Sequence, residues 1–282
     1  MNPGVSPILR ARPSLVKDLL VARSALVLRI KRMREYSLDF LASAAFIPIT
    51  MLVTLVVWRV VFGTSTLLGG YTFSGLVSYY LAVQLVSLVV HQASPVAWFV
   101  WQDINSGNLG SYLARPLDYQ LLLLGKCAGP VAVYLPVAVL IYRLAAFIWD
   151  LPVSLEPLRL AILSGIVAGG FLIWYLVQFI CASLAFWIGK IDTLRDLVVE
   201  VFMFFSGAIV PNDLLPGVLG SVGRVLPSKY MLYVPVSVIT GRISLDQMLE
   251  LLREEYLWVA ALFIISRVLW ARGTRRFEAQ GG

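Results

Sequence analysis

The sequence predicts an all-α membrane protein that crosses a lipid bilayer six times. Of its 282 residues, 59% are hydrophobic and only 14% are charged, and the mean hydropathy is +0.83. Soluble domains carry about a quarter charged residues, so a soluble fold of this composition would lack a water-facing surface. The apolar residues also come in uncharged blocks, such as residues 160–189. A bilayer core needs about 20 apolar residues per helix.

Six segments can each cross the bilayer as a helix. The fifth begins with Arg195, Asp196 and Glu200, and the sixth contains Arg267. Such charges must reach the interface or be shielded by other protein segments. The predicted spans are residues 40–62, 72–94, 119–148, 158–188, 194–210 and 256–270. Together they form one transmembrane domain over residues 40–272, between a cytoplasmic region of residues 1–39 and a cytoplasmic tail of residues 273–282.

The distribution of charge predicts the orientation. Most of the 23 Lys and Arg residues lie in residues 1–39, in the turns after every second span and after the sixth span. The first loop on the other side, residues 63–70, has no charge, and Asp150 and Glu156 make the next one acidic. Cytoplasmic segments carry an excess of Lys and Arg, so both termini are expected in the cytoplasm. The net charge of +7 thus indicates orientation rather than a nucleic-acid surface.

Residues 14–34 have the pattern of an amphipathic interfacial helix. Apolar positions recur every three or four residues at Leu15, Leu19, Ala22, Leu26 and Ile30. The basic positions are Lys17, Arg23, Arg29, Lys31, Arg32 and Arg34. We expect this helix to lie along the cytoplasmic membrane surface. The alternative is that the basic residues only enforce topology. Since the segment has no uninterrupted apolar core, a cleavable signal peptide is not expected.

Residues 96–118 differ from an ordinary loop between spans. They begin with the aromatic residues Trp98, Phe99 and Trp101 and continue as a polar, glycine-rich turn. This pattern predicts a short cytoplasmic helix pressed against something outside the bilayer. A simple connecting loop is the alternative.

The segment after the fifth span is too apolar for a solvated loop and too broken for a span. Pro211 ends the helix, and residues 212–227 then alternate apolar residues with Pro216, Gly217, Gly220 and Gly223. Irregular backbone at membrane depth is tolerated where protein covers it. We therefore expect two short helices that dip back into the outer leaflet. Residues 229–255 return as an outer segment that is partly helical over residues 245–252.

The chain lacks a phosphate-binding loop. Such a loop needs glycine-rich backbone followed by Lys and then Ser or Thr. Gly125-Lys126-Cys127 and Gly189-Lys190-Ile191 lack both the upstream glycine spacing and the hydroxyl. ATP hydrolysis by this device is therefore excluded, and the chain is not expected to be an enzyme.

Other chemistry-bearing residues are sparse. His91 is the one histidine, and it cannot build a zinc site or a Ser-His-Asp relay without further ligands or partners, so a structural interfacial role is expected. Cys127 and Cys181 lie in apolar segments and are expected to pack. Glu200 is the acidic residue placed inside an apolar segment, where a local ion pair with Arg195 is favoured over a proton relay. We expect no metal and no cofactor on this chain.

Three stretches together resemble the permease subunits of ABC type-2 transporters, in particular small bacterial six-helix permeases encoded separately from their ATPase. They are the run Arg34-Glu35-Tyr36-Ser37-Leu38-Asp39-Phe40, the run Ile104-Asn105-Ser106-Gly107-Asn108-Leu109 continuing to Leu113-Ala114-Arg115-Pro116-Leu117, and the run Phe205-Ser206-Gly207-Ala208-Ile209-Val210-Pro211 continuing to Leu226-Pro227 and Tyr233-Val234-Pro235. Ser37 stands where the family pattern has Arg. The resemblance covers most of the chain.

The resemblance implies roles for the segments outside the spans. The amphipathic helix acts as a connecting helix, and the segment between spans two and three is a coupling helix that docks on the ATPase. The coupling residues implied are Trp101, Asp103, Ile104, Asn105, Gly107, Leu109 and Arg115. The substrate pathway implied is Tyr79, Val83, Ser87, Phe202, Phe205 and Ser206. The outer gate implied is Pro211, Pro216 and Pro227, within outer re-entrant helices.

The resemblance also implies partners and a location. Two ATPase subunits, which carry ATP and Mg²⁺, and a second permease, identical or homologous, complete a dimeric efflux transporter in the bacterial cytoplasmic membrane. An amphipathic or hydrophobic cargo such as a drug, lipid or natural product is expected. The competing readings are a secondary transporter or channel without an ATPase, and a membrane-embedded enzyme. The first needs intramembrane carboxylates or broken helices, and the second needs clustered His, Asp or Glu.

Overall fold

The computed structural model describes residues 15–33, 37–115, 117–149, 156–188 and 191–280, and these residues are almost entirely helical. In this part of the chain β structure is limited to an isolated bridge between Leu68 and Tyr71. Several residues used in the sequence predictions lie outside the described ranges. They are Arg34, Glu35, Tyr36, Pro116, Asp150 and Lys190.

The helices follow the apolar blocks of the sequence and end mainly at glycine and proline. The α-helices are α1 Leu15–Met33, α2 Ser37–Phe62, α3 Phe73–Val90, α4 Val96–Asn105, α5 Asn108–Leu113, α6 Tyr119–Trp149, α7 Pro157–Ser183, α8 Ala185–Ile188, α9 Asp192–Phe205, α10 Gly217–Val225, α11 Tyr233–Ile239 and α12 Leu245–Gln280. The 3₁₀ helices are η1 His91–Ala93, η2 Asn212–Leu214 and η3 Pro227–Tyr230.

Four helical stretches of the described chain are long and apolar enough to cross a membrane. They are Phe73–Asn105, Tyr119–Leu144, Pro157–Ile188 and Leu245–Phe277. They contain the spans predicted at residues 72–94, 119–148, 158–188 and 256–270 almost completely. In α2 the shorter apolar stretch Ile49–Phe62 is described. The all-α membrane fold is thus confirmed with four candidate spans, and the count of six stays a prediction.

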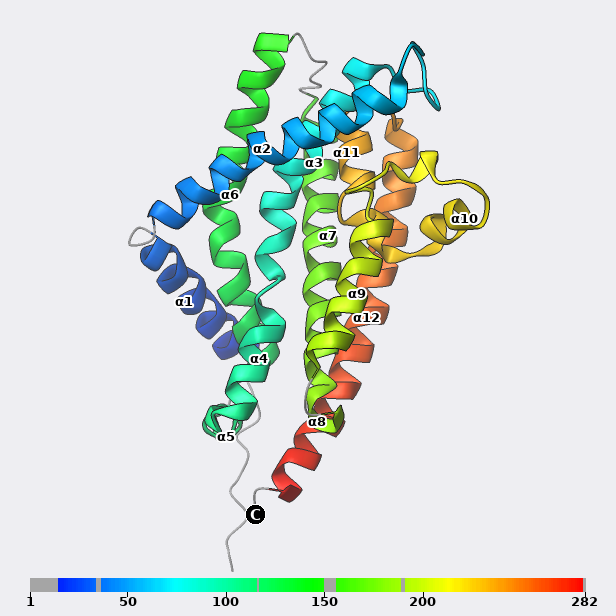
Figure 1. Ribbon diagram of the computed structural model, residues 1–282. Helices are drawn as coiled ribbons and strands as arrows, with labels where there is room; N and C mark the ends of the chain where they lie inside the picture. The colour runs from blue at the N-terminus through cyan, green and yellow to red at the C-terminus, as the bar shows by residue number, and fades with distance from the viewer. Residues whose placement is uncertain (1–14, 34–36, 116, 150–155, 189–190, 281–282) are drawn as a thin grey trace, which may run out of the picture.

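The core lies around α3 and α7 (Figure 1). In the candidate spans that contain α3 and α7, 56% of the most apolar window is buried, against 28% in α6 and 17% in α12. Trp174, Tyr175 and Phe179 of α7 are among the largest fully buried side chains. Helices α6 and α12 flank this pair, with α9 beside α7 and with α2 crossing diagonally in front. The outer faces of α6 and α12 are therefore part of the apolar surface left for lipid.

The bundle has an upper and a lower end, as drawn in Figure 1. The upper end carries the loop between α2 and α3, helix α11 and the start of α12. The lower end carries α5, α8 and the end of α12. The segments predicted to lie outside the membrane on opposite sides thus lie at opposite ends of the structure.

Two predicted helices have different bounds in the structure. The fifth span was predicted over residues 194–210, but α9 ends at Phe205 because Gly207 adopts a φ of +87°, which a helix does not accommodate. The outer helix at residues 245–252 and the span at residues 256–270 are one continuous helix, α12. That helix contains no proline, and its first glycine is Gly273, so no residue with strong helix-breaking character interrupts it.

The predicted amphipathic helix forms as α1 and packs along α6 (Figure 1). The closest approach is at Gly125 of α6, where an added Cβ would collide with the backbone carbonyl of Ala22. Val21 and Ala25 pack against the core. Leu19, Leu20, Val27 and Leu28 are each more than 40% exposed. One side of α1 is thus anchored on α6, while apolar side chains on other sides are free to contact lipid.

The segment predicted at residues 96–118 is not a simple loop, because residues 96–105 and 108–113 are helical. Helix α4 continues the direction of α3 after the short η1 turn, and α5 forms a separate helix at the lower end (Figure 1). Gly107 separates the two with a φ of +73°, which glycine adopts without strain. The segment therefore ends in a tight turn at the tip of the bundle.

Candidate functional site

The turn that follows α9 is built around Gly207. Its φ of +87° lies in the left-handed region, which costs other residues roughly 1–2 kcal/mol. An added Cβ would also lie 2.6 Å from Oη of Tyr79 and 2.8 Å from Cβ of Tyr233. The Tyr233 amide donates a hydrogen bond of 2.7 Å to the Ser206 carbonyl. The Ser-Gly pair of the sequence motif therefore meets both a conformational and a steric requirement.

Two adjacent tyrosines of α3 hold this turn. The Tyr79 hydroxyl donates to the Gly207 carbonyl at 2.8 Å, and the Tyr80 hydroxyl donates to the Ile209 carbonyl at 2.6 Å. Both side chains are at most 2% exposed, and their rings meet edge to face with centroids 5.3 Å apart. A buried carbonyl left without a partner is costly. We therefore expect α3 and the upper end of α9 to move together.

Three of the six predicted pathway residues are buried within the chain. Tyr79 and Ser206 are 0% exposed, and Val83 is 4% exposed. Tyr79 contacts Gly207, the residue next to Ser206, so the structure brings α3 and the α9 turn together at this point. The Ser206 hydroxyl donates back to the Met203 carbonyl at 2.8 Å, which closes the last turn of α9.

The other three predicted pathway residues are partly exposed. They are Ser87 on α3 and Phe202 and Phe205 on α9. The Phe202 ring lies 6.3 Å from the Trp174 ring of α7, centroid to centroid. These side chains lie between the core and the surface, where the chain offers apolar and aromatic area. Their role in a pathway stays a prediction.

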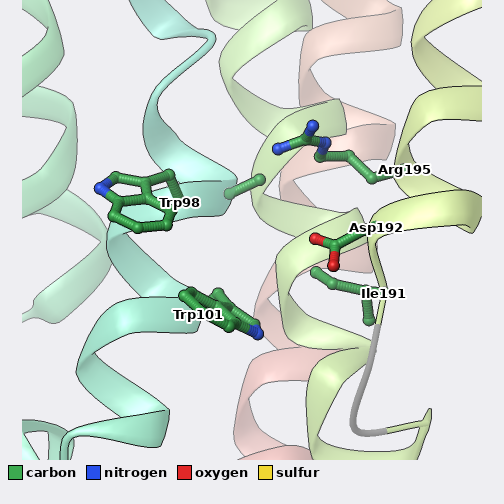
Figure 2. Close-up of a pocket in the computed structure, with 6 residues that line it drawn as sticks. Trp98, Trp101, Ile191, Asp192 and Arg195 are labelled. Atoms are coloured by element: carbon green, nitrogen blue, oxygen red, sulfur yellow. The ribbon is translucent and has the colours of Figure 1, made fainter.

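A small pocket lies between α4 and the start of α9 (Figure 2). Its volume is about 150 Å³, and it is lined by Ala97, Trp98, Trp101, Ile191, Asp192 and Arg195. The two indole rings are stacked with centroids 5.3 Å apart, and the Arg195 guanidinium pairs with the Asp196 carboxylate at 2.7 Å. Of these residues the sequence had suggested Trp101 alone as a site residue. The spacing of the two tryptophans by three residues was the signal for a shared helix face.

The predicted coupling residues divide into anchors and an exposed tip. Leu109 is 0% exposed and packs in the core, and Ile104 packs against it. The Asp103 carboxylate accepts a hydrogen bond of 2.6 Å from the Tyr119 hydroxyl at the start of α6. These contacts fix α4 and α5 on the bundle.

The tip itself faces outward at the lower end. Asn105, Gly107 and Arg115 are exposed, and Trp101 is partly exposed. An added Cβ at Gly107 would meet nothing within 4 Å. A fixed segment with an exposed polar tip is suited to contact another macromolecule, and the docking role stays a prediction.

The three prolines of the predicted outer gate each stand at the start of a short helix. Pro211 precedes η2, Pro216 precedes α10, and Pro227 is the first residue of η3. Proline suits these positions because its fixed φ is compatible with a helix start and the missing N–H is not needed there. Pro211 and Pro227 are buried, whereas Pro216 is exposed. The segment predicted to form two short helices contains α10 and the 3₁₀ helices η2 and η3, and its place in the outer leaflet stays a prediction.

A buried carboxyl group that the sequence did not indicate lies on α12. Glu255 is 0% exposed, and neither of its carboxyl oxygens has a hydrogen-bond partner. It lies against Gly169 of α7, where an added Cβ would be 2.5 Å from the carboxyl carbon. The sequence placed residue 255 outside the membrane and singled out Glu200, which is exposed on α9. Only the continuity of α12 and its packing on α7 reveal Glu255.

The remaining candidate residues, His91, Cys127 and Cys181, lie among packed side chains. The His91 ring lies 6.3 Å from the Trp174 ring, and Cys127 and Cys181 are buried free thiols. Within the part of the chain that the structure describes, no group of three or more His, Cys, Asp and Glu side chains could hold a metal ion.

Most of the chain, from within α2 through α12, matches a single family model. Residues 48–281 match the model described as ABC-2 family transporter protein. The matched range contains the Tyr79 and Gly207 contact, the α4 and α5 tip and the outer helices described above. No curated protein matches the chain closely enough to count as a relative.

Proposed function

Because the chain belongs to the ABC-2 transporter family, we propose that it is the permease subunit of an ATP-binding-cassette exporter that works with a separate ATPase. The family match over residues 48–281 carries this proposal. The match agrees with the resemblance found in the sequence, and proteins of this family are components of membrane transporters. ATP and Mg²⁺ then belong to the partner ATPase, of which two copies are expected.

The proposed topology has six crossings, by α2, α3, α6, α7, α9 and α12, with both termini in the cytoplasm of a bacterial cell. The lower end is then cytoplasmic. Arg272, Arg275 and Arg276 near the end of α12 lie there, whereas the upper loop of residues 63–70 has no charge. This asymmetry supports the orientation.

Helix α9 supports the proposed re-entrant segment. It has 14 residues, which span roughly 21 Å at 1.5 Å per residue, less than the ~30 Å of a bilayer core. The turn after α9 would therefore lie at membrane depth. Backbone carbonyls at that depth need protein donors, and the hydroxyls of Tyr79 and Tyr80 supply them for Gly207 and Ile209.

In the proposed mechanism, ATP binding closes the two ATPase subunits and moves the α4 and α5 segment as a rigid body. Leu109 in the core and the Asp103 to Tyr119 hydrogen bond would transmit that movement to the bundle. The cavity between two paired permeases, identical or homologous, would then change from inward- to outward-facing. A ligand drives such a change only if it binds the two states with different affinity.

The cargo is proposed to be amphipathic or hydrophobic. The partly exposed rings of Phe202 and Phe205 and the stacked pair Trp98 and Trp101 offer aromatic surface along α9 and α4. Such surfaces bind apolar groups without demanding a specific charge.

The test is to express the chain together with its candidate ATPase and measure cargo-stimulated ATP hydrolysis in liposomes. Asn105→Arg at the exposed tip should lower coupled hydrolysis by about tenfold or more, since a new charge at a docking contact costs at least about 1.4 kcal/mol. Thr64→Arg, in the exposed loop at the upper end, is the matched control and should leave it unchanged. A chain that purifies without an ATPase and exports cargo without nucleotide would contradict the proposal.

A second candidate function rests on Glu255. A carboxyl group buried in a candidate span without a partner is a feature of ion-coupled transporters. A secondary transporter without an ATPase would move cargo at the expense of an ion gradient. Dissipating the gradient at constant ATP would stop such a transporter, whereas an ATP-driven exporter would continue.

A further inference from the structure

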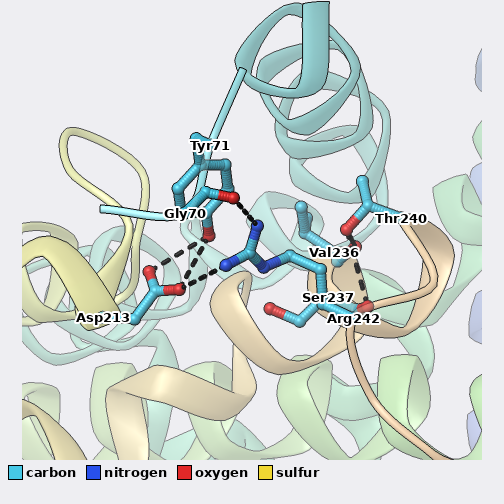
Figure 3. Close-up of polar contacts among 7 residues, drawn as sticks. All are labelled: Gly70, Tyr71, Asp213, Val236, Ser237, Thr240 and Arg242. Atoms are coloured by element: carbon cyan, nitrogen blue, oxygen red, sulfur yellow. Dashed lines mark hydrogen bonds and ion pairs between the residues drawn. The ribbon is translucent and has the colours of Figure 1, made fainter. Parts of the chain in front are cut away.

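Three side chains from distant parts of the sequence meet at the upper end of the bundle (Figure 3). The Tyr71 hydroxyl donates to the Asp213 carboxylate at 3.0 Å, and an Arg242 nitrogen donates to the same carboxylate at 3.1 Å. The Arg242 guanidinium also lies 3.6 Å from the centre of the Tyr71 ring and donates to the Gly70 carbonyl at 3.4 Å. The cluster Tyr71, Asp213 and Arg242 therefore closes a triangle in which each member contacts the other two.

The chemistry of the triangle is self-consistent. Burial, together with the neighbouring Asp213 carboxylate, raises the pKa of Tyr71 above its ordinary value, so the hydroxyl remains a donor. The Arg242 cation neutralises the carboxylate and stacks on the ring, which is favourable for a cation over an aromatic face. If any one of the three side chains is removed, each of the other two loses a contact.

The triangle joins three separate outer segments. Tyr71 ends the loop between α2 and α3, Asp213 lies in η2 after α9, and Arg242 lies in the turn between α11 and α12. Glycines with positive φ flank these segments at Gly63, Gly69, Gly70, Gly207, Gly217 and Gly241. Turns of this kind can absorb large backbone rotations.

The contacts at the upper surface differ from those beneath them. The Tyr79 hydrogen bond to the Gly207 carbonyl is buried, and the Tyr80 hydrogen bond to the Ile209 carbonyl is part-buried. By contrast, the Arg242 and Asp213 side chains are 33% and 30% exposed. A partly exposed ion pair is reached by water and salt and is weak, so it can break and reform, whereas the buried Tyr79 hydrogen bond is costly to break.

We propose that Tyr71, Asp213 and Arg242 form a releasable latch that holds the outer end of the permease closed at rest. The proposal rests on the proposed export function, since the cargo would leave at this end. Release separates Asp213 from Tyr71 and Arg242, which frees η2 and α10 from the loop before α3. The buried tyrosines then carry the α9 turn along with α3.

The test measures access from outside to a cysteine below the latch. Val83→Cys places a thiol on α3 at a position that is 4% exposed, and a membrane-impermeant maleimide is applied to intact cells. Asp213→Asn or Arg242→Gln should raise the labelling rate about 2- to 5-fold, as expected for losing a partly exposed ion pair. Tyr71→Phe, which removes only the hydroxyl, should give a smaller increase.

A matched control breaks another outer ion pair. Arg159 pairs with Glu156 at 3.1 Å at the start of α7, and Arg159→Gln should leave the labelling rate unchanged. The chain without Val83→Cys reports any labelling of the two native thiols. Labelling is measured at rest and without an ATPase, so the latch is tested even if the proposed export function fails.

Two outcomes would overturn the latch. The first is unchanged labelling in Asp213→Asn and Arg242→Gln while their thermal stability falls, which would indicate a purely structural cluster. The second is increased labelling that the charge-exchanged variant Asp213→Arg with Arg242→Asp does not reverse. If either single variant fails to fold, Tyr71→Phe alone decides, because unchanged labelling there contradicts the shared role of the hydroxyl.

Discussion

At the scale of single residues, the position of Gly207 requires a left-handed backbone and leaves no room for a Cβ, and glycine is the residue type that meets both demands. Gly207→Ala should lower the free energy of unfolding by about 2–4 kcal/mol, since left-handed strain adds to a contact with Tyr79. The loss of stability is measured by thermal unfolding in detergent, with size-exclusion chromatography as the readout. The same variant should weaken export, because the Tyr79 hydrogen bond to Gly207 holds the turn.

Gly217 is the control that separates the two demands. Its φ is +49°, but an added Cβ would meet nothing within 4 Å. Gly217→Ala should therefore cost only the backbone strain, about 1–2 kcal/mol. Equal losses in the two variants would show that the close contact at Gly207 contributes nothing.

At the scale of helices, the sequence predicted the helical segments that hydropathy determines. The block predicted at residues 158–188 became the candidate span Pro157–Ile188, which α7 and α8 form together, whereas Pro211, predicted to end the fifth helix, lies beyond the end of α9 at Phe205. The sequence could not predict the end of α9 at Phe205, because that end depends on the left-handed conformation at Gly207. It also could not predict the position of Glu255, which depends on how α12 packs against Gly169 of α7.

The candidate sites were less predictable than the helices. The sequence indicated Trp98 and Trp101 as part of an aromatic helix start, but the pocket also needs Asp192 and Arg195 from α9. The hydrogen bonds of Tyr79 and Tyr80 join residues that lie 128 and 129 positions apart. Pairings of this kind leave no local signal in the sequence.

The contact between α1 and α6 gives a prediction at the helix scale. In Gly125→Ala the new methyl group collides with the Ala22 carbonyl, and backbone cannot swing aside as a flexible side chain can. The cost of overpacking, about 1–3 kcal/mol, outweighs the gain of up to about 1 kcal/mol in helix propensity. Helix α1 should loosen from α6.

Limited trypsin digestion measures this loosening at Arg23, which is exposed on α1. Cleavage should be several-fold faster in Gly125→Ala. Gly110→Ala on α5 is the control, because an added Cβ there meets nothing within 4 Å. Equal cleavage rates in the two variants would contradict the anchoring of α1 on α6.

At the scale of the whole molecule, the chain separates a buried centre from two responsive ends. Helices α3 and α7 supply the core, the α4 and α5 tip lies at the lower end, and the outer helices lie at the upper end. The buried Tyr79 hydrogen bond connects α3 to the upper turn, and the Asp103 to Tyr119 bond connects α4 to α6. In the proposed ATP-driven mechanism, these contacts form the route from the lower tip to the predicted outer gate.

The energy source of transport, ATP or an ion gradient, is a property of the whole molecule, and a substitution at Glu255 tests it. Glu255→Gln keeps the shape of the side chain and removes the ionisable group. In an ATP-driven permease we expect transport to change by less than about tenfold, which corresponds to ~1.4 kcal/mol in the barrier. In an ion-coupled transporter the same variant should abolish gradient-driven uptake or export, because the coupling group is lost.

Glu250→Gln, which changes an exposed carboxylate on the same helix, controls for the change in net charge. Transport in liposomes with ATP alone, and then with an ion gradient alone, measures both cases. Loss of transport in Glu255→Gln but not in Glu250→Gln, with the variant still folded, would contradict ATP as the sole energy source.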